Sequence, residues 1–173
     1  DGRLWRIIPS QKYVSVDYST DYGKSFGQAI RLNPTDMPIH LWDENPPAIS
    51  VDREGRVYVL YFADDQQSST SFFSHSDNGT LFSAPIKISS EANTWYHYQT
   101  EMLVDAKNRI HFIWHDTRDR AEYKKQGGGD LSIYHASAKT KTIEAPFSDQ
   151  RIAKNICSCC RTAMAEDVDG NLV

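Results

Sequence analysis

A short turn sequence that recurs about every fifty residues constrains the fold of this chain more than any other feature. Four segments share it, residues 1–5, 54–58, 107–111 and 169–173, which read DGRLW, EGRVY, KNRIH and DGNLV. Their marker residues, at positions 2, 55, 108 and 170, are 53, 53 and 62 residues apart. A regular period of this length predicts an array of equivalent supersecondary units.

Four short strands are expected within each period. In the second period they cover residues 48–52, 56–62, 70–75 and 84–89. Four antiparallel strands in every ~40 to 50 residues are typical of a β-propeller blade. We therefore predict an all-β fold, a β-propeller of four-stranded antiparallel blades, with residues 1–173 forming a single partial propeller domain.

A second turn motif recurs in step with the first. It consists of Ser19, Asp21, Gly23 and Phe26 in the first unit and of Asp77, Gly79 and Phe82 in the second. The Asp side chain can accept hydrogen bonds from the amides of its own turn, Gly supplies a positive φ, and Phe packs under the turn as an apolar plug. We interpret these residues as structural. In the third unit Ala138 and Thr140 stand where Asp and Gly are expected, so that turn is predicted to be looser.

These turns, together with residues 114–118 (WHDTR), resemble the Asp-box or BNR-repeat proteins, whose best known members are sialidases. The resemblance covers the chain as repeats, and it implies a sialidase-like propeller with six blades. About three blades are present, so we expect either part of a six-bladed ring or a half-ring that a second copy completes. The resemblance also implies a ligand pocket on the face opposite the Asp turns.

The composition of the chain limits the classes of partner that are expected. With 39% apolar residues and a formal net charge of −4, the chain has an ordinary globular composition. No apolar stretch reaches about 18 residues, so no membrane span is expected. Lys and Arg are scattered rather than gathered into a basic stripe, so nucleic acid is not an expected partner.

The connections that enter the second and third blades contain aromatic and acidic residues in unusual density. The candidate ligand-binding residues there are Trp42, Asp43, Glu44, Trp95, His97, Tyr98 and Glu101. Aromatic faces beside carboxylates suit carbohydrate, whose C–H surfaces stack on rings while its hydroxyl groups form hydrogen bonds. The alternative is that these aromatic residues pack between the blades.

Two arginines are candidates for binding an anionic ligand. Asp116 and Arg118 resemble an acidic-x-Arg element of sialidases, in which the Arg helps to hold the carboxylate of the substrate. Arg161 lies near the predicted central axis. An Arg fork matches a planar carboxylate, but each arginine also has a local partner available, Asp116 for Arg118 and Glu101 for Arg161. Both interpretations stay open.

The sialidase resemblance stops short of an active site. The first arginine of that family precedes the Asp-Gly turn of its blade, whereas Arg6 follows Gly2 and has different spacing. The nucleophile, the general base and the complete arginine triad cannot be assigned, so the catalytic residues stay unknown.

All the cysteines lie in one short segment, at Cys157, Cys159 and Cys160. A disulfide, with one thiol left over, is one interpretation. Two others are a metal site for zinc or copper, completed by a ligand from elsewhere, and buried thiols.

The leading hypothesis is an extracytoplasmic propeller, periplasmic or secreted, that recognises a glycan or another small anionic ligand on its blade-connection face. Glycoside hydrolase activity of the exo-sialidase type belongs to this hypothesis. The alternative is a non-enzymatic extracytoplasmic scaffold that binds a protein partner or a metal through the cysteine cluster.

Overall fold

The structure is a computed structural model of the whole chain. It describes residues 2–43, 45–64, 69–90, 97–121, 131–143, 147–157 and 160–173, with the backbone alone at residues 69, 97 and 98.

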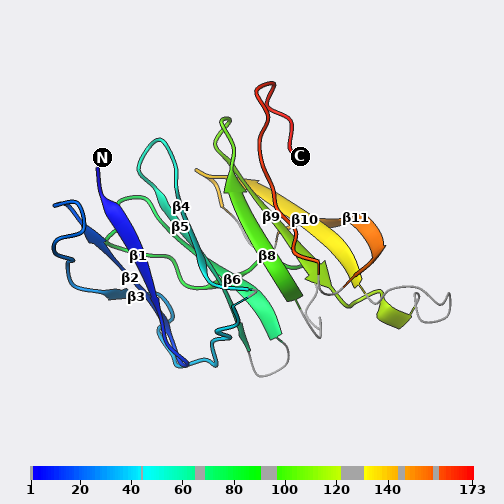
Figure 1. Cartoon of the computed structure of the whole chain (residues 1–173), viewed down its shortest axis with the longest axis horizontal. Coiled ribbons are helices and arrows are strands. Elements are labelled where there is room, and N and C mark those ends of the chain that lie inside the picture. The colour runs from blue at the N-terminus through cyan, green and yellow to red at the C-terminus, as the bar shows by residue number, and fades with distance from the viewer. Residues whose placement is uncertain are drawn as a thin grey trace.

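The described residues form three antiparallel sheets that lie side by side (Figure 1). The first contains β1 (Leu4–Pro9), β2 (Val14–Ser19) and β3 (Ile30–Arg31). The second contains β4 (Ala48–Val51), β5 (Val57–Asp64), β6 (Ser69–Ser76) and β7 (Ile86–Lys87). The third contains β8 (His97–Val104), β9 (Arg109–Asp116), β10 (Leu131–Lys139) and β11 (Asp149–Ile156).

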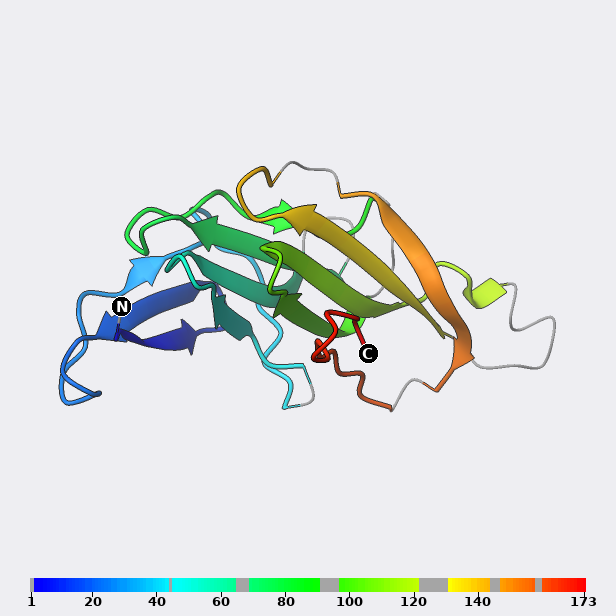
Figure 2. The same ribbon diagram turned by 90° about the horizontal axis from the view of Figure 1, so that it is seen from above.

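In every sheet the strands follow one another in chain order, so each sheet is an up-and-down meander like a propeller blade. Seen from above, the sheets succeed one another across the molecule (Figure 2). This architecture confirms the prediction of an all-β partial propeller. Because β1 follows Gly2 as β5 follows Gly55, the first sheet corresponds to the second, third and fourth strands of a blade.

At Gly55, Asn108 and Gly170, the recurring turn is held by an aspartate three residues before the marker. Oδ1 of Asp52 accepts hydrogen bonds from the amides of Glu54 and Arg56, both at 2.9 Å. Asp105 and Asp167 hold their own turns in the same way. The markers all have left-handed backbone, with φ of 76° at Gly2, 84° at Gly55, 57° at Asn108 and 80° at Gly170. These three aspartates are not among the residues singled out from the sequence.

The turn at Ser19 has the predicted hydrogen bonds and the predicted positive φ at Gly23. The Oγ of Ser19 accepts from the amide of Gly23 at 2.8 Å, and Asp21 accepts from the amide and the hydroxyl of Ser25 at 2.9 and 2.6 Å. The Ser25 hydroxyl and then the Ser19 hydroxyl lower the pKa of Asp21 to about 2. Phe26 lies beneath the Arg6 guanidinium, 3.8 Å from ring centroid to carbon.

The turn at Ser76 corrects one assignment. Its acceptor is the side chain of Asn78, which receives hydrogen bonds from the amides of Thr80 and Leu81 at 2.9 and 3.2 Å, rather than that of Asp77. The Ser76 hydroxyl accepts from the amide of Gly79 at 2.9 Å, so this turn is one residue shorter than the first. In both turns the acceptor is the residue two positions after Ser, Asp21 and Asn78, whereas counting back two positions from Gly points to Asp77 in the second turn. Phe82 packs against the neighbouring apolar cluster, as predicted.

In the third unit the turn after β10 is tied to the second sheet. The Thr140 hydroxyl accepts from the Arg56 guanidinium at 2.9 Å and donates to the Asn108 carbonyl at 3.0 Å. Arg56 is also paired with Asp52 at 2.8 Å. A buried arginine thus links the two sheets at this turn.

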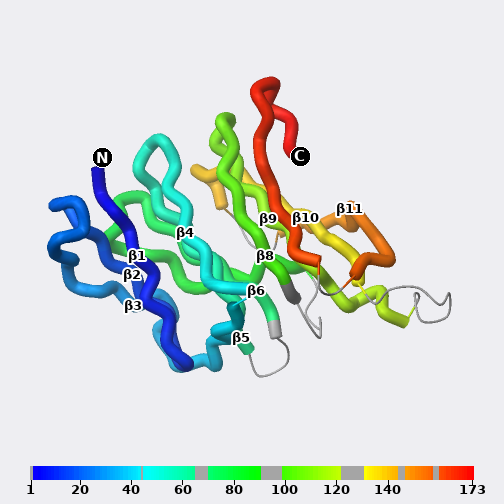
Figure 3. The backbone as a smooth tube through the Cα atoms, viewed as in Figure 1, coloured from blue at the N-terminus to red at the C-terminus, as the bar shows by residue number. Residues whose placement is uncertain are grey.

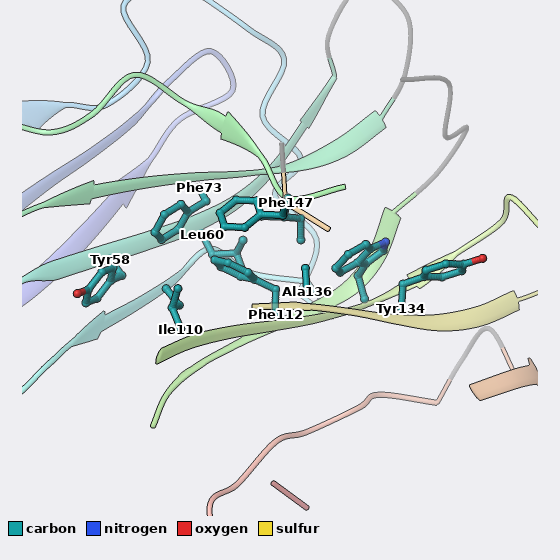
Figure 4. Packing of buried hydrophobic residues seen from close by; sticks show 10 residues of the cluster. Tyr58, Leu60, Phe73, Ile110, Phe112, Tyr134, Ala136 and Phe147 are labelled. Carbon is teal, nitrogen blue, oxygen red and sulfur yellow. The ribbon is translucent and has the colours of Figure 1, made fainter. Parts of the chain in front are cut away.

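Two apolar clusters fill the spaces between the sheets. One joins the first and second sheets and includes Val14, Val16, Val59 and Tyr61. The other joins the second and third sheets through aromatic side chains (Figure 4), and Phe112 packs edge-on to both Phe73 and Phe147, at ring-centroid distances of 5.0 and 5.4 Å. The second sheet buries one face on the first sheet and the other on the third, so the array is held together as stacked repeat units are.

The other face of the third sheet carries histidines where the second sheet has aromatic rings. The Tyr58 hydroxyl donates to Asp52 at 2.8 Å, and at the equivalent position His111 pairs through Nε2 with Asp105 at 3.1 Å. His111 Nδ1 also lies 3.1 Å from Nε2 of His135. His135 lines a cavity of about 390 Å³ together with Ile113, Ile133, Ile152, Thr162, Ala163, Met164, Leu172 and Val173.

This histidine face predicts loss of stability in mild acid. Burial, then the charges of His111 and Arg109, lower the pKa of His135, and burial lowers that of His115. The unfolded chain, in which His has a pKa of about 6.5, therefore binds more protons than the folded chain just below that pH. We expect the free energy of unfolding to fall as the pH drops from about 7 to about 5.

Urea unfolding of the wild type and of His135→Phe across this pH range tests the expectation. Phenylalanine matches Phe73, which occupies the equivalent position of the second sheet. The variant should lose less stability in acid than the wild type. Identical pH dependence of the free energy of unfolding in the two proteins would show that His135 does not cause the loss of stability.

Candidate functional site

The two edges of the array of sheets are formed by different segments, the recurring turns at one edge and the connections at the other. The turns between β4 and β5 and between β8 and β9, together with the C-terminal hairpin, all rise at the top in Figure 3. They share this edge with the turns at Ser19 and Ser76, because strands alternate in direction. Residues 32–43 and 45–47, which join the first sheet to the second, and residues 117–121, which follow β9, lie at the opposite edge, called here the connection face. Of the candidate ligand residues, Trp42, Asp43 and Arg118 lie on these segments.

On the connection face, His40 and Trp42 form an aromatic cluster with Phe62. A bridge between Ile39 and Ala63 places this segment beside the end of β5. The ring centroids of His40 lie 4.8 Å from Trp42 and 4.6 Å from Phe62. Trp42 keeps 38% of its surface exposed, so it packs on the protein through one part and faces solvent with another.

A carboxylate orients the histidine of this cluster. Nε2 of His40 lies 2.8 Å from Oδ1 of Asp64. A neutral ring that donates from Nε2 keeps Nδ1 as a hydrogen-bond acceptor. Aromatic surface, a carboxylate and an imidazole are thus brought together at one place on the connection face. His40 lay in the connection noted from the sequence, whereas Asp64 was missed, because only the fold brings the end of β5 next to it.

The segment that carries Trp42 is tied to the third sheet. The amide of Asn45 donates to the Trp42 carbonyl at 3.0 Å, and the Asn45 side chain accepts from the amide of Thr100 at 3.1 Å. The hydroxyls of Ser71 on β6 and Thr100 on β8 lie 2.6 Å apart. The contact of these two strands with the Asn45 segment is called here the seam. The Trp42 segment and the start of β8 therefore form one surface.

Arg161 pairs with Glu101, as one of the two sequence interpretations held. Its Nε and one terminal nitrogen each lie 3.3 Å from Oε1 of Glu101. The Arg161 side chain is 58% exposed and that of Glu101 is 26% exposed. This pair lies one residue beyond Thr100, next to the seam described above.

Arg118 is instead part of a buried network between sheets. Its guanidinium donates to Asp116 at 2.7 Å, to Ser89 at 2.8 Å and to Asp149 at 3.2 Å. It also stacks over Tyr134, at 3.8 Å from the ring centroid. Burial opposes the charge, but the hydrogen bonds that Arg118 donates to Asp116 and Asp149 raise its pKa. These contacts favour the structural pair of Asp116 and Arg118 over a ligand contact.

Several predicted site residues cannot be placed. Glu44, Trp95 and Cys159 lie outside the described residues, and only the backbone is described for His97 and Tyr98. Asp43 is exposed beside Trp42.

Cys157 and Cys160 are exposed, and no disulfide joins them to each other. In the described ranges no group of three or more His, Cys, Asp and Glu side chains has the arrangement of a metal site, so zinc or copper at the cysteines stays a prediction. No helix within those ranges is long and apolar enough to cross a membrane.

Sheets of this kind, joined in this order, define the chain as part of a β-propeller, and solved structures support this assignment. An α-L-arabinofuranosidase from Fusarium graminearum matches 98% of the chain with a TM-score of 0.54 and 14% identity. A Penicillium chrysogenum α-L-arabinanase in complex with arabinobiose matches 86% with a TM-score of 0.51 and 12% identity. A protein of unknown function from Dyadobacter fermentans matches 87% with a TM-score of 0.54 and 13% identity. At these identities the similarity shows the fold.

One curated relative, lactonase drp35 of Staphylococcus haemolyticus, is 25% identical over 134 residues, which is 78% of the chain. The chain spans 38% of that relative and 38% to 47% of the three solved structures. No family model matches the sequence.

Proposed function

We propose that this protein is a carbohydrate-binding propeller whose site is the connection face around Trp42. The observation that carries the proposal is the cluster of His40, Trp42 and Phe62, with Asp64 paired to the histidine. A partly exposed indole supplies the apolar platform for the C–H face of a sugar. The His40–Asp64 pair beside it supplies polar groups for hydroxyl recognition.

The similar solved structures give this proposal its chemical direction. Two of them are named as enzymes acting on arabinose-containing carbohydrates, and one contains arabinobiose. We extend the proposal to hydrolysis of a glycosidic bond. The exo-sialidase form of that activity has less support, because Arg118 is held by two aspartates inside the protein.

The alternative of a non-enzymatic scaffold uses the cysteine segment instead of the Trp42 cluster. Its support is the exposure of Cys157 and Cys160. It predicts a partner or a metal that depends on the thiols and is indifferent to Trp42, and this contrast separates the two proposals.

Replacing Trp42 with alanine tests the proposed site. Titration calorimetry with arabino-oligosaccharides and with 3′-sialyllactose would measure binding, and the matching chromogenic glycosides would measure hydrolysis. We expect the variant to bind the preferred sugar at least about tenfold more weakly, which corresponds to ~1.4 kcal/mol of lost stacking.

Tyr22→Ala is the matched control, because Tyr22 is 95% exposed and lies on the Ser19 turn at the opposite edge. It should leave affinity unchanged. Equal affinity in wild type and Trp42→Ala would contradict the placement of the site, and no binding of any of these sugars by the wild type would contradict the function.

A further inference from the structure

The cavity of about 390 Å³ beside the third sheet has the properties of a small-molecule site. Ile113, Ile133 and Ile152 line it from the sheet, and Met164 and Leu172 line it from the C-terminal segment. Sites for small molecules have volumes of about 300 to 1,000 Å³ and combine an apolar lining with a few polar groups that orient the ligand. The cavity has this size and this apolar lining, so its polar groups decide what it can bind.

Among the described residues that line the cavity, only His135 has an ionisable side chain. Its Nε2 lies 3.1 Å from Nδ1 of His111, and Nε2 of His111 lies 3.1 Å from Oδ2 of Asp105. An ionised carboxylate only accepts hydrogen bonds, so His111 donates to Asp105 from Nε2. A neutral His111 then accepts at Nδ1 from the Nε2–H of His135. A neutral His135 therefore keeps its own Nδ1 without a hydrogen, as an acceptor.

The Nδ1 of His135 is available to a molecule in the cavity. No described residue forms a hydrogen bond with it, since the contact with His111 uses Nε2. It is not one of the buried atoms that lack a partner, so part of its surface is accessible. Burial, then the charges of His111 and Arg109, lower the pKa of His135, which keeps the ring neutral at neutral pH. The cavity thus offers a hydrogen-bond acceptor within an apolar lining.

The second sheet has Phe73 at the position that His135 occupies in the third. Phe73 packs against Phe112 and Phe147 in the aromatic cluster of Figure 4 and needs no polar partner. A ring whose role is to fill space would be served equally by phenylalanine. The imidazole at this position therefore points to a role for its second nitrogen.

We propose that this cavity binds a small, largely apolar molecule with one hydroxyl group, such as a phenol, whose hydroxyl donates to Nδ1 of His135. The apolar body of the ligand would lie against the isoleucines of the sheet and the side chains of the C-terminal segment. None of the residues that carry the proposed carbohydrate site, His40, Trp42, Phe62 and Asp64, lines this cavity. The two sites are therefore independent of each other.

The single acceptor sets the chemistry of the ligand. A carboxylate has no hydrogen to donate, so its oxygens would face the lone pair of Nδ1. A pure hydrocarbon would cover Nδ1 without giving it a partner, and an unsatisfied buried polar atom costs about 1 to 3 kcal/mol. The chain bounds the cavity on two sides, the sheet and the C-terminal segment, which favours a small molecule over a protein partner.

Two probes of similar shape test the proposal on the wild-type protein, para-propylphenol and its methyl ether. Only the phenol can donate to Nδ1, and at about pH 7.5 it keeps its proton. Titration calorimetry should show the phenol binding about fivefold to tenfold more tightly than the ether, the effect of one hydrogen bond. Equal affinities would overturn the role of His135. Binding of neither probe at millimolar concentration would overturn the site.

His135→Phe should abolish the preference for the phenol and leave the affinity for the ether unchanged. If both probes weaken equally, the histidine acts through its shape, and the proposed hydrogen bond is wrong. Ala163→Phe adds a ring at the lining of the cavity and should weaken both probes by at least about tenfold, which corresponds to ~1.4 kcal/mol. Ala165→Phe is its matched control, because Ala165 is also exposed in this segment and does not line the cavity. Equal effects of the two alanine substitutions would contradict binding in this cavity.

Discussion

Replacing Asp116 with alanine is expected to lower the free energy of unfolding by about 3 to 5 kcal/mol, the usual cost of breaking a buried ion pair from one side. Asp116 is fully buried and accepts hydrogen bonds from Arg118 and from the Trp114 indole. Its removal leaves the guanidinium of Arg118 with only part of its partners inside the protein. Chemical denaturation measures the change directly.

Asp36→Ala is the matched control for this experiment. Asp36 pairs with Arg31 at 2.6 Å, but its side chain is 56% exposed. Water replaces such a partner easily, so we expect a loss of about 1 kcal/mol or less. Similar losses in the two variants would show that the Arg118 network does not hold the second and third sheets together.

Gly79→Ala is expected to lower the free energy of unfolding by about 2 to 4 kcal/mol. An alanine Cβ at this position would lie 2.5 Å from the Trp5 ring, and φ is 76°. Alanine would therefore add a left-handed strain of about 1 kcal/mol to an overpacking cost of about 1 to 3 kcal/mol. Moving Trp5 to relieve the contact would disturb the packing of the first sheet on the second.

Gly2→Ala separates the two contributions. Gly2 has the same φ of 76°, but nothing lies within 4 Å of an added Cβ. Only the backbone strain remains there, so a loss of about 1 kcal/mol is expected. Equal losses at the two glycines would mean that the Trp5 ring moves aside without cost.

The sequence was sufficient to predict the architecture because period and turn chemistry are local properties. The spacing of Gly2, Gly55 and Asn108 predicted three equivalent units, and all three residues have the left-handed backbone of one turn. The signal for the missed aspartates was also present, since Asp52, Asp105 and Asp167 each precede their marker by three residues.

Sequence reasoning was less successful for the site, because its residues meet only in the folded chain. Asp64 lies 24 residues from His40, and nothing in the sequence indicates that they pair. Arg118 matched a motif for carboxylate recognition, but its partners Ser89 and Asp149 come from distant segments.

Tyr58 in the second sheet and His111 in the third occupy equivalent positions, so a phenol in one sheet corresponds to an imidazole in the next. Burial raises the pKa of Tyr58 to about 12, so its bond to Asp52 keeps its proton at any physiological pH. The corresponding bond in the third sheet joins the imidazole of His111 to Asp105, and His111 also lies within hydrogen-bond distance of His135. Because burial lowers the pKa of His135 and of His115 on this sheet, mild acid destabilises it, and the protection of β9 and β10 against amide hydrogen exchange should fall as the pH falls from about 7 to about 5.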